Sequence, residues 1–488
     1  MFRSTASFLC VGLILFWVAA GATAQTTRAG KGDKRAGSTT RTWTDVTGKF
    51  KVRASLVDVE EGNVRLRKSD GKTISVPLEK LSEADQQWIA KNASGATTEG
   101  VPAAAAGGAS DWPSFRGPNR DGKSPDTGLL KQWPEGGPKL LWEVNDLGKG
   151  FSSASVAGGM IYITGLSGNG LTLFALDMDG KHVWKADLGA DWDNYPGARA
   201  SATIDEGKVY LLSGAGMLGC FDAKRGKPLW SHHAKEFGGS PGQWGYAESV
   251  LIYGNAAIFK PGGRNCIVAL NKQNGQPLWS SRGFQAGPEY SSCLLFVHDR
   301  TPMIATGTNQ GLVCVNAQNG AMLWSNPFAA NNTANCPTPA YSDGYVFWAN
   351  GYGKGGICMK LGRGGTASQA WTTNDMVCHH GGYIIQEGYI YGNNGEGWAC
   401  LDLRTGKKQW EERAVGKGSL CWADGMLYLF SENSGRAALG TCSPEGLKIT
   451  GQMQVRGKDK SWAHPVVIGG RLYLRYDTNL YCFDVKAK

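Results

Sequence analysis

Apolar and polar positions recur in a fixed order along most of this 488-residue chain. In the clearest copy, residues 218–230, a short apolar run ends at Asp222, a turn closes at Gly226, and a second run carries Trp230. An Asp side chain accepts hydrogen bonds from nearby backbone N–H groups, and Gly adopts a positive φ without steric penalty. The pattern therefore predicts two short strands joined by a tight turn.

This unit occurs eight times. Its turn position, at intervals of 38 to 49 residues, falls at Asp177, Asp222, Asn271, Asn316, Leu361, Asp402, Gly440 and Asp484. A second unit alternates with the first and consists of an apolar strand, a Gly turn and an aromatic-rich strand, as in residues 202–212. Two such units per period make about four strands, which is one propeller blade. We predict an all-β chain with an eight-bladed β-propeller over residues 111–488.

The ends of the repeat region predict how the ring closes. The eighth unit reaches the chain end before any Trp strand, whereas an unpaired strand, residues 140–144 with Trp142, precedes the first unit. A row of blades would leave two open sheet edges, which invite aggregation. We expect the N-terminal strand to complete the last blade.

The N-terminus has the pattern of a secretory signal over residues 1–24. Arg3 supplies the positive charge, residues 8–20 form an apolar run, and Ala22-Thr23-Ala24 is a small-residue cleavage site. We therefore predict an exported protein, periplasmic or extracellular. The alternative is an uncleaved N-terminal anchor. No other stretch is long and apolar enough to cross a bilayer, so no transmembrane segment is predicted after signal removal.

A small module is predicted between two linkers, residues 25–40 and 92–110. Within residues 41–91, runs at 52–57, 63–67 and 73–76 alternate like half-buried strands. Residues 78–91 predict a short helix with Ser82 as its N-cap. Three strands and a helix in about fifty residues indicate a small barrel.

The motifs of this module resemble a known family. They are Arg41-Thr-Trp43, Thr47-Gly-Lys-Phe50, Val64-Arg-Leu66, Asp70-Gly-Lys72 and Val76-Pro-Leu-Glu-Lys-Leu-Ser82. They are similar to the first Sla-homology domain, an SH3-like module named from an endocytic adaptor. The resemblance implies a barrel that binds an envelope protein or peptide partner; a purely structural appendage is the alternative.

Charge and cysteine placement narrow the function classes. The net charge of +10 is spread along the chain without a basic run, so no nucleic-acid partner is predicted. Neighbouring blades separate equivalent Cys residues beyond the roughly 4.4–6.8 Å Cα distance of a disulfide. Free buried thiols are therefore expected at the equivalent strand positions Cys220, Cys266, Cys314, Cys358, Cys400 and Cys482. The sequence does not exclude one disulfide bond among Cys293, Cys336, Cys378, Cys421 and Cys442.

The large domain also resembles a known superfamily. The Asp111-Trp-Pro-x-Phe-Arg-Gly-Pro118 opening, the Asp-x-x-x-Gly-x-x-x-Trp repeat and residues 243–249 (Gln-Trp-Gly-Tyr-Ala-Glu-Ser) are similar to secreted bacterial PQQ-like propellers. These include the quinoprotein dehydrogenases and the BamB-type assembly scaffolds. The repeat is specific for the fold and weak for function.

Candidate ligand-binding residues follow from the propeller topology. Chain entering the innermost strand of each blade borders the central channel, where converging polar and aromatic groups form a binding site. These segments supply Arg199, Trp244, Glu248, Tyr290, Asn335, His379, His380, Trp462 and His464 at the channel mouth.

The His379–His380 pair is the sharpest local feature. Adjacent residues on a regular strand point to opposite faces, so one shared metal ion would need an irregular backbone. The chain lacks the Cys-x-x-Cys and His-x-x-x-His spacings of zinc sites. We predict no metal ligand from the sequence.

Two functions remain open. The first is an envelope scaffold that binds a small molecule or a protein at the channel mouth. The alternative, implied by the resemblance, is a PQQ-dependent oxidoreductase of alcohols, polyvinyl alcohol or sugars, holding PQQ with calcium. Such enzymes often have a disulfide between adjacent cysteines, and this chain has no Cys-Cys pair. Glu248 and Glu289 could serve as calcium ligand or base. No catalytic residue is assigned, and the sequence favours binding.

Overall fold

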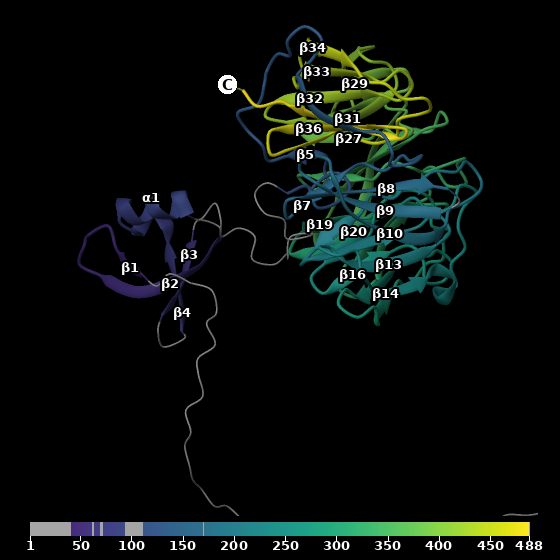
Figure 1. Ribbon diagram of the computed structural model, residues 1–488. Helices are drawn as coiled ribbons and strands as arrows, with labels where there is room; N and C mark the ends of the chain where they lie inside the picture. The colour runs from purple at the N-terminus through teal and green to yellow at the C-terminus, as the bar shows by residue number, and fades with distance from the viewer. Residues whose placement is uncertain (1–40, 61–62, 69–71, 93–110, 169, 488) are drawn as a thin grey trace, which may run out of the picture. The chain divides into compact units, whose positions relative to one another are not determined.

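The computed structural model describes residues 41–487 apart from 61–62, 69–71, 93–110 and 169 (Figure 1). The predicted signal at 1–24 and the predicted linkers at 25–40 and 92–110 lie outside the described residues, except for Asn92, which is the last residue of α1. The chain divides into two compact units, with the boundary between Glu99 and Gly100. No helix in the described part of the chain has the length and apolar character needed to cross a bilayer.

The small unit is a four-stranded antiparallel sheet followed by a helix. Its strands pair in the order β1-β2-β3-β4. The elements are β1 (Arg41–Thr44), β2 (Lys51–Glu60), β3 (Asn63–Lys68), β4 (Thr73–Pro77), η1 (Leu78–Lys80) and α1 (Glu83–Asn92). Trp43, Val64, Leu66, Leu81 and Ile89 are buried in its core. The arrangement agrees with the predicted SH3-like module.

The helix of this unit begins later than predicted. Residues 78–80 form a single 3-10 turn, Leu81 is extended, and α1 starts at Glu83. The backbone N–H of Ser82 donates to Thr44 O at 2.8 Å, which holds this residue beside β1. The Ser82 hydroxyl accepts from the N–H of Asp85 at 3.2 Å, so its predicted capping role is confirmed.

The large unit contains eight sheets within residues 111–487, each built on four antiparallel strands, which confirms the eight-bladed propeller. Blades one to four are β7 (Ser155–Ala157), β8 (Met160–Ser167), β9 (Gly170–Asp177), β10 (His182–Ala190); β11 (Thr203–Asp205), β12 (Lys208–Leu212), β13 (Met217–Asp222), β14 (Pro228–His233); β15 (Leu251–Tyr253), β16 (Ala256–Phe259), β17 (Val268–Asn271), β18 (Pro277–Ser280); β19 (Leu294–His298), β20 (Thr301–Thr308), β21 (Gly311–Asn316) and β22 (Met322–Asn326). A short 3-10 helix, η3 (Ala234–Phe237), follows β14.

The remaining blades continue the same order. They are β23 (Ala340–Ser342), β24 (Tyr345–Asn350), β25 (Gly355–Leu361), β26 (Ala367–Thr373); β27 (Tyr383–Gln386), β28 (Tyr389–Asn394), β29 (Gly397–Asp402), β30 (Lys408–Glu412); β31 (Gly418–Ala423), β32 (Met426–Ser431), β33 (Arg436–Thr441), β34 (Ile449–Gln454); β35 (Val466–Ile468), β36 (Arg471–Tyr476), β37 (Asn479–Asp484) and β6 (Lys139–Val144). The 3-10 turn η4 (Arg363–Gly365) joins β25 to β26. The first strands of adjacent blades contact one another in six of the eight pairs, as β23 does with β27.

The last blade closes as predicted. β6 pairs antiparallel with β37, with Trp142 opposite Cys482 and Val144 opposite Leu480. A second N-terminal strand, β5 (Lys123–Ser124), adds in parallel to β31 of the seventh blade. Figure 1 shows β5 beside β31, so the N-terminal part of the large unit also joins the seventh blade.

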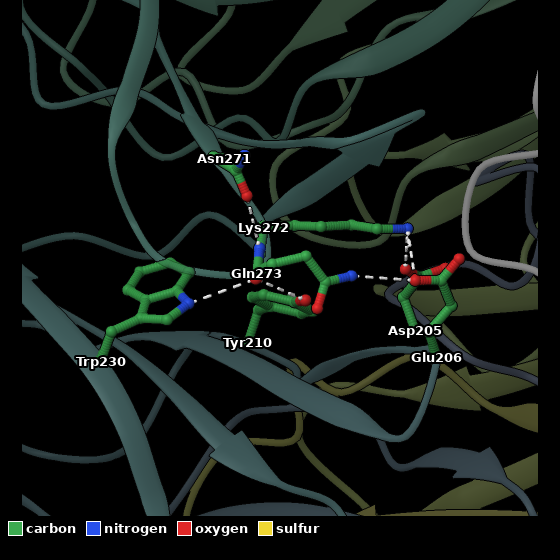
Figure 2. A network of polar contacts seen from close by, with 7 residues as sticks. All are labelled: Asp205, Glu206, Tyr210, Trp230, Asn271, Lys272 and Gln273. Atoms are coloured by element: carbon green, nitrogen blue, oxygen red, sulfur yellow. Dashed lines mark hydrogen bonds and ion pairs between the residues drawn. The ribbon is translucent and has the colours of Figure 1, made fainter.

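Polar contacts join neighbouring blades, as between blades two and three (Figure 2). Lys272 is buried, and its ammonium lies 2.5 Å from Asp205 Oδ2 and 3.2 Å from the carboxylate of Glu206. The Lys272 carbonyl accepts hydrogen bonds from the indole of Trp230 at 3.2 Å and the hydroxyl of Tyr210 at 3.0 Å. The Trp of the repeat in one blade thus donates a hydrogen bond to the turn of the next blade.

The eleven cysteines of the described chain are free thiols. The six equivalent strand positions are all buried, as the sequence predicts. The bridge left open among the other five does not form in this structure. The cysteines between the blades therefore serve as small apolar side chains.

Candidate functional site

A cavity of about 270 Å³ lies where the segments that enter the innermost strands converge. Seven of the eight blades and the segment before β5 contribute to its wall. The lining residues are Phe115, Phe151, Tyr195, Arg199, Trp244, Ala247, Ser249, Tyr290, Ser292, Ala334, Cys336, Tyr352, His379, His380, Trp462 and His464.

A hydrogen-bonded chain of backbone and hydroxyl groups fixes these segments relative to one another. The N–H of His464 donates to Ser153 Oγ at 2.8 Å, and the N–H of Ser153 donates to Ser201 Oγ at 2.9 Å. The chain continues from Ser201 to Ser249 at 3.1 Å and from Ser249 to Ser292 at 3.0 Å. It crosses the closure between blades eight and one, so the cavity depends on a closed ring.

The segment before β5 crosses the channel and forms part of the cavity wall. Phe115 lines the cavity, with its ring 5.1 Å from that of His464. The buried guanidinium of Arg120 donates to Ser249 O at 2.6 Å and Val250 O at 2.9 Å in blade three. The guanidinium of Arg116 donates to Tyr383 O in blade six. These three hydrogen bonds anchor the segment to blades three and six.

One side of the cavity is a continuous stack of rings. The indole of Trp462 lies 4.3 Å from Phe151, 5.3 Å from Tyr195 and 4.2 Å from His380, with angles between ring planes of 33°, 24° and 29°. His380 lies 3.6 Å from His379, and Tyr352 meets His379 edge-on at 4.7 Å. Such a wall is complementary to a flat, conjugated molecule.

Arg199 supplies a permanent positive charge to the cavity. Its guanidinium donates to the backbone carbonyl oxygens of Gly197 at 3.1 Å, Asn194 at 3.4 Å and Tyr195. Among the described residues it forms no salt bridge with a carboxylate. Trp244 and Tyr290, whose rings lie 5.8 Å apart, also line the cavity. An acidic ligand group would therefore find a donor here.

Lys417 and Glu432 of the seventh blade adjoin the His pair. The Lys417 ammonium lies 2.9 Å from His379 Nδ1 and 3.1 Å from Glu432 Oε2, which in turn is 3.8 Å from His380 Nδ1. Burial, together with the His380 ring and the Lys417 charge, lowers the pKa of His379 to about 3. Burial also lowers the pKa of His380. Burial opposes ionisation of Glu432, but its contacts with His380 and Lys417 bring its pKa down to about 2. Both imidazoles are thus neutral at pH 7 beside the ionised Glu432 carboxylate.

Seven of the nine sequence-predicted site residues line this cavity: Arg199, Trp244, Tyr290, His379, His380, Trp462 and His464. Glu248 and Asn335 do not. The Glu248 carboxylate accepts from the N–H of Lys260, and burial raises its pKa. The side-chain amide of Asn335 donates to Thr308 O and Ala329 O, each at 3.0 Å.

Glu248 and Asn335 point away from the cavity because each lies in an extended segment whose neighbouring residues point into it. Ala247 and Ser249 line the cavity on either side of Glu248, and Ala334 and Cys336 do so on either side of Asn335. Alternate side chains of an extended segment point to opposite sides. Glu248 and Asn335 consequently face the packing between blades.

Four aromatic residues of the wall were missed by the sequence argument: Phe115, Phe151, Tyr195 and Tyr352. Phe151 lies four residues before β7, as Arg199 does before β11 and Trp462 before β35. This shared spacing could have identified Phe151 from the sequence. Tyr195 and Tyr352 belong to longer connections with positive φ, at 61° and 56°, and no periodic signal places them.

Comparison with known families identifies both units. The family model for outer membrane protein assembly factor BamB matches residues 134–281 and 170–412, which together span more than half of the chain. The model for SLA1 homology domain 1 matches residues 32–96. The actin cytoskeleton-regulatory complex protein SLA1 of Mycosarcoma maydis is 40% identical over 60 residues, which are 12% of this chain and only 5% of that protein.

Solved structures with the same fold include a BamB and a quinohemoprotein alcohol dehydrogenase. BamB from Moraxella catarrhalis aligns with a TM-score of 0.53 and 14% identity, covering 72% of this chain and 98% of that one. Quinohemoprotein alcohol dehydrogenase from Comamonas testosteroni aligns with a TM-score of 0.57 and 12% identity, covering 78% and 81%. At such identities the likeness establishes the fold alone.

Proposed function

Because the chain belongs to the family of outer membrane protein assembly factor BamB, we propose that its propeller is a binding scaffold whose central cavity holds a small, planar molecule carrying an acidic group. The single observation that carries this proposal is the ring stack around Trp462. The stack includes Tyr195, whose carbonyl accepts from Arg199, a guanidinium that forms no salt bridge among the described residues. The family fold supplies a rigid ring, and the side chains of this chain define the ligand.

The shape of the ligand follows from the wall. Rings in offset or tilted stacks within about 4.5–7 Å stabilise one another by about 0.5–1.5 kcal/mol per pair beyond burial. A planar guest beside Trp462 and Trp244 gains such contacts, whereas a puckered ring of the same size does not. The cavity of about 270 Å³ limits the guest to a small molecule.

The charge of the ligand follows from Arg199. A guanidinium binds a carboxylate through paired N–H···O bonds, which are roughly twice as strong as neutral hydrogen bonds. The cavity lining contains no Asp or Glu side chain among the described residues. An anionic group therefore meets no repulsive partner in the wall.

The oxidoreductase alternative fits this cavity poorly. Calcium is bound by oxygen ligands, mainly carboxylates, and a dehydrogenase base must reach the substrate. Glu248 and Glu289 are engaged by the backbone N–H groups of Lys260 and Asn335, respectively, and neither lines the cavity. We therefore propose binding rather than PQQ-dependent dehydrogenation.

Tryptophan fluorescence tests the proposal. We expect naphthalene dicarboxylate, a planar acid, to quench the emission saturably, and naphthalene methanol and cyclohexane dicarboxylate to bind at least about tenfold more weakly. Arg199→Gln should weaken binding of the acid, whereas Arg404→Gln, an exposed matched control, should not. Equal affinity for all three probes would contradict the proposal. Quinone uptake that requires calcium, with dye reduction by alcohols or sugars, would favour the alternative.

We also propose that the chain is exported, on the signal pattern of residues 1–24. Mass spectrometry of the protein isolated from its own cells should find an N-terminus at Gln25. A mature chain that begins at Met1 would contradict export by a cleaved signal.

For the small unit we propose a peptide-binding role. Its support is the turn between β1 and β2, where Phe50 is 76% exposed and Val46 is 61% exposed. Large apolar side chains exposed together indicate a contact surface. Panning a displayed peptide library against the full chain should enrich peptides that bind the wild-type protein but not its Phe50→Ser variant. Enrichment unaffected by this substitution would contradict the proposed surface.

A further inference from the structure

A group of metal-ligating side chains lies on one wall of the cavity, at the junction of blades five and six. Cys336, His379 and His380 each place one ligand atom within 4.8 Å of the other two. In a tetrahedral zinc site, bonds of about 2.0–2.3 Å place ligand atoms about 3.3–3.8 Å apart. Side-chain rotations that close about an ångström therefore suffice to bring all three to bonding distance.

The backbone at the His pair is irregular, which removes the sequence argument against a shared ion. Residues 379–380 lie in a bend rather than a strand, and their rings are 3.6 Å apart on the same side. Gly381 and Gly382 permit this path. A Cβ at Gly381 would lie 1.6 Å from Gly418 O, and Gly382 has a φ of +69°.

Lys417 and Glu432 lie beside the Nδ1 atoms of His379 and His380, which leaves the Nε2 atom of each ring for an ion. His379 Nδ1 faces Lys417, and His380 Nδ1, which is buried without a hydrogen-bond partner, lies 3.8 Å from Glu432 Oε2. Metal-binding histidines commonly give their second nitrogen to a carboxylate. Binding of an ion at His379 Nε2 requires the ring proton to move to Nδ1, which then no longer accepts from Lys417. The Lys417 ammonium keeps a partner, because it already lies 3.1 Å from the Glu432 carboxylate.

We propose that Cys336, His379 and His380 bind one transition-metal ion of the Zn²⁺ class, with a fourth coordination position open to the cavity. One thiolate and two imidazoles suit zinc and its neighbours, whereas calcium and magnesium require oxygen ligands. Binding forms one metal–sulfur and two metal–nitrogen bonds and releases the Cys336 thiol proton to solvent, without a change of oxidation state. The site stands independently of the planar acid ligand.

Cobalt is the spectroscopic probe for this site. Co²⁺ added to the chelator-treated full chain should bind one to one and give a near-ultraviolet thiolate-to-cobalt absorption band, which Zn²⁺ should abolish by displacement. Cys336→Ser should remove the band, and His379→Asn should weaken Co²⁺ binding by more than the roughly 10–100-fold typical of losing an outer partner. Glu432→Gln should weaken it within that range.

Matched controls separate the site from other thiols and histidines. Cys442 is the other half-buried cysteine of the described chain, and His298 lies in blade four. Cys442→Ser and His298→Asn should leave the band and the affinity unchanged. A band that persists in Cys336→Ser, or that disappears in Cys442→Ser, would overturn the proposal. If Cys336→Ser does not fold, X-ray absorption of the zinc-loaded wild type decides: a zinc shell without sulfur would also overturn it.

Discussion

The indole N–H of Trp142 donates to the backbone carbonyl of Met178 at 2.9 Å. Trp142 belongs to β6 in the last blade, and Met178 follows β9 in the first, so this bond joins the two ends of the ring. The same indole lies over Gly180, where a Cβ would come within 2.9 Å of it. Ring closure thus uses the contact that joins other neighbouring blades, such as Trp184 with Ala223 O at 3.0 Å.

The first prediction concerns this closure. Trp142→Ala should lower the free energy of unfolding by about 3 kcal/mol, the lower end for a Trp-to-Ala change, because the indole is only half-buried. Urea denaturation measures the change. Leu141→Ala, on the same strand and 38% exposed, should change stability by less than about 0.5 kcal/mol. Equal effects of the two variants would contradict closure through Trp142.

A second prediction isolates the Gly–Trp contact from backbone strain. Gly226 and Gly207 have similar φ angles, +67° and +73°, but only at Gly226 would a Cβ meet a ring, 2.4 Å from Trp184. Both Gly→Ala variants carry the cost of a positive φ, about 1–2 kcal/mol. Gly226→Ala should lose at least about 1 kcal/mol more, since overpacking adds to the strain. Thermal unfolding of the two variants gives the difference, and a difference of zero would refute the contact.

The third prediction concerns the ion pair of Figure 2. Lys272→Met removes the ammonium that lies 2.5 Å from the buried Asp205 carboxylate, so stability should fall by about 3–5 kcal/mol. Gln273→Ala removes only an exposed hydrogen bond to Glu206 and should have an effect below about 0.5 kcal/mol. Chemical denaturation compares the two. A Lys272→Met protein as stable as wild type would show that the ion pair does not join the blades.

The fourth prediction concerns the small unit. Buried Asp85 accepts from Arg41 Nη2 at 2.6 Å, Thr44 N–H at 2.7 Å and Ser82 Oγ at 2.9 Å, and the Arg41 guanidinium lies over the rings of Trp43 and Trp88. Asp85→Ala leaves these donors unpaired and should destabilise the unit by about 3–5 kcal/mol. Amide hydrogen exchange of the full chain should rise in β1–β4 but not in the propeller. Glu79→Gln, an exposed control, should leave exchange unchanged.

The fold could be predicted because each residue of the sequence repeat makes a defined contact in the blade. The Asp or Asn closes a turn, and the Gly makes room for the Trp of the preceding blade, as Gly275 does for Trp230. The missing Trp strand at the C-terminus and the spare one at Trp142 together specified closure. The predicted N-cap at Ser82 matches the start of α1, but the non-helical path of residues 78–81 was missed, because the Ser82–Thr44 backbone bond that holds it is a tertiary contact.

The cavity was only partly predictable, for a reason of geometry. Arg199, His379 and Trp462, which were chosen because they precede innermost strands, line the cavity. It did not fix which neighbour in an extended segment faces inward, so Glu248 was selected although Ala247 and Ser249 line the cavity. Aromatic rings from long connections, such as Tyr195 and Tyr352, have no sequence period.

The cavity can be tested directly by a crystal structure of the chain grown with naphthalene dicarboxylate. The account predicts the naphthalene ring beside Trp462 and Trp244, with one carboxylate within about 3 Å of the Arg199 guanidinium. Ligand density elsewhere on the propeller, with this cavity empty at saturating concentration, would contradict the proposed binding function.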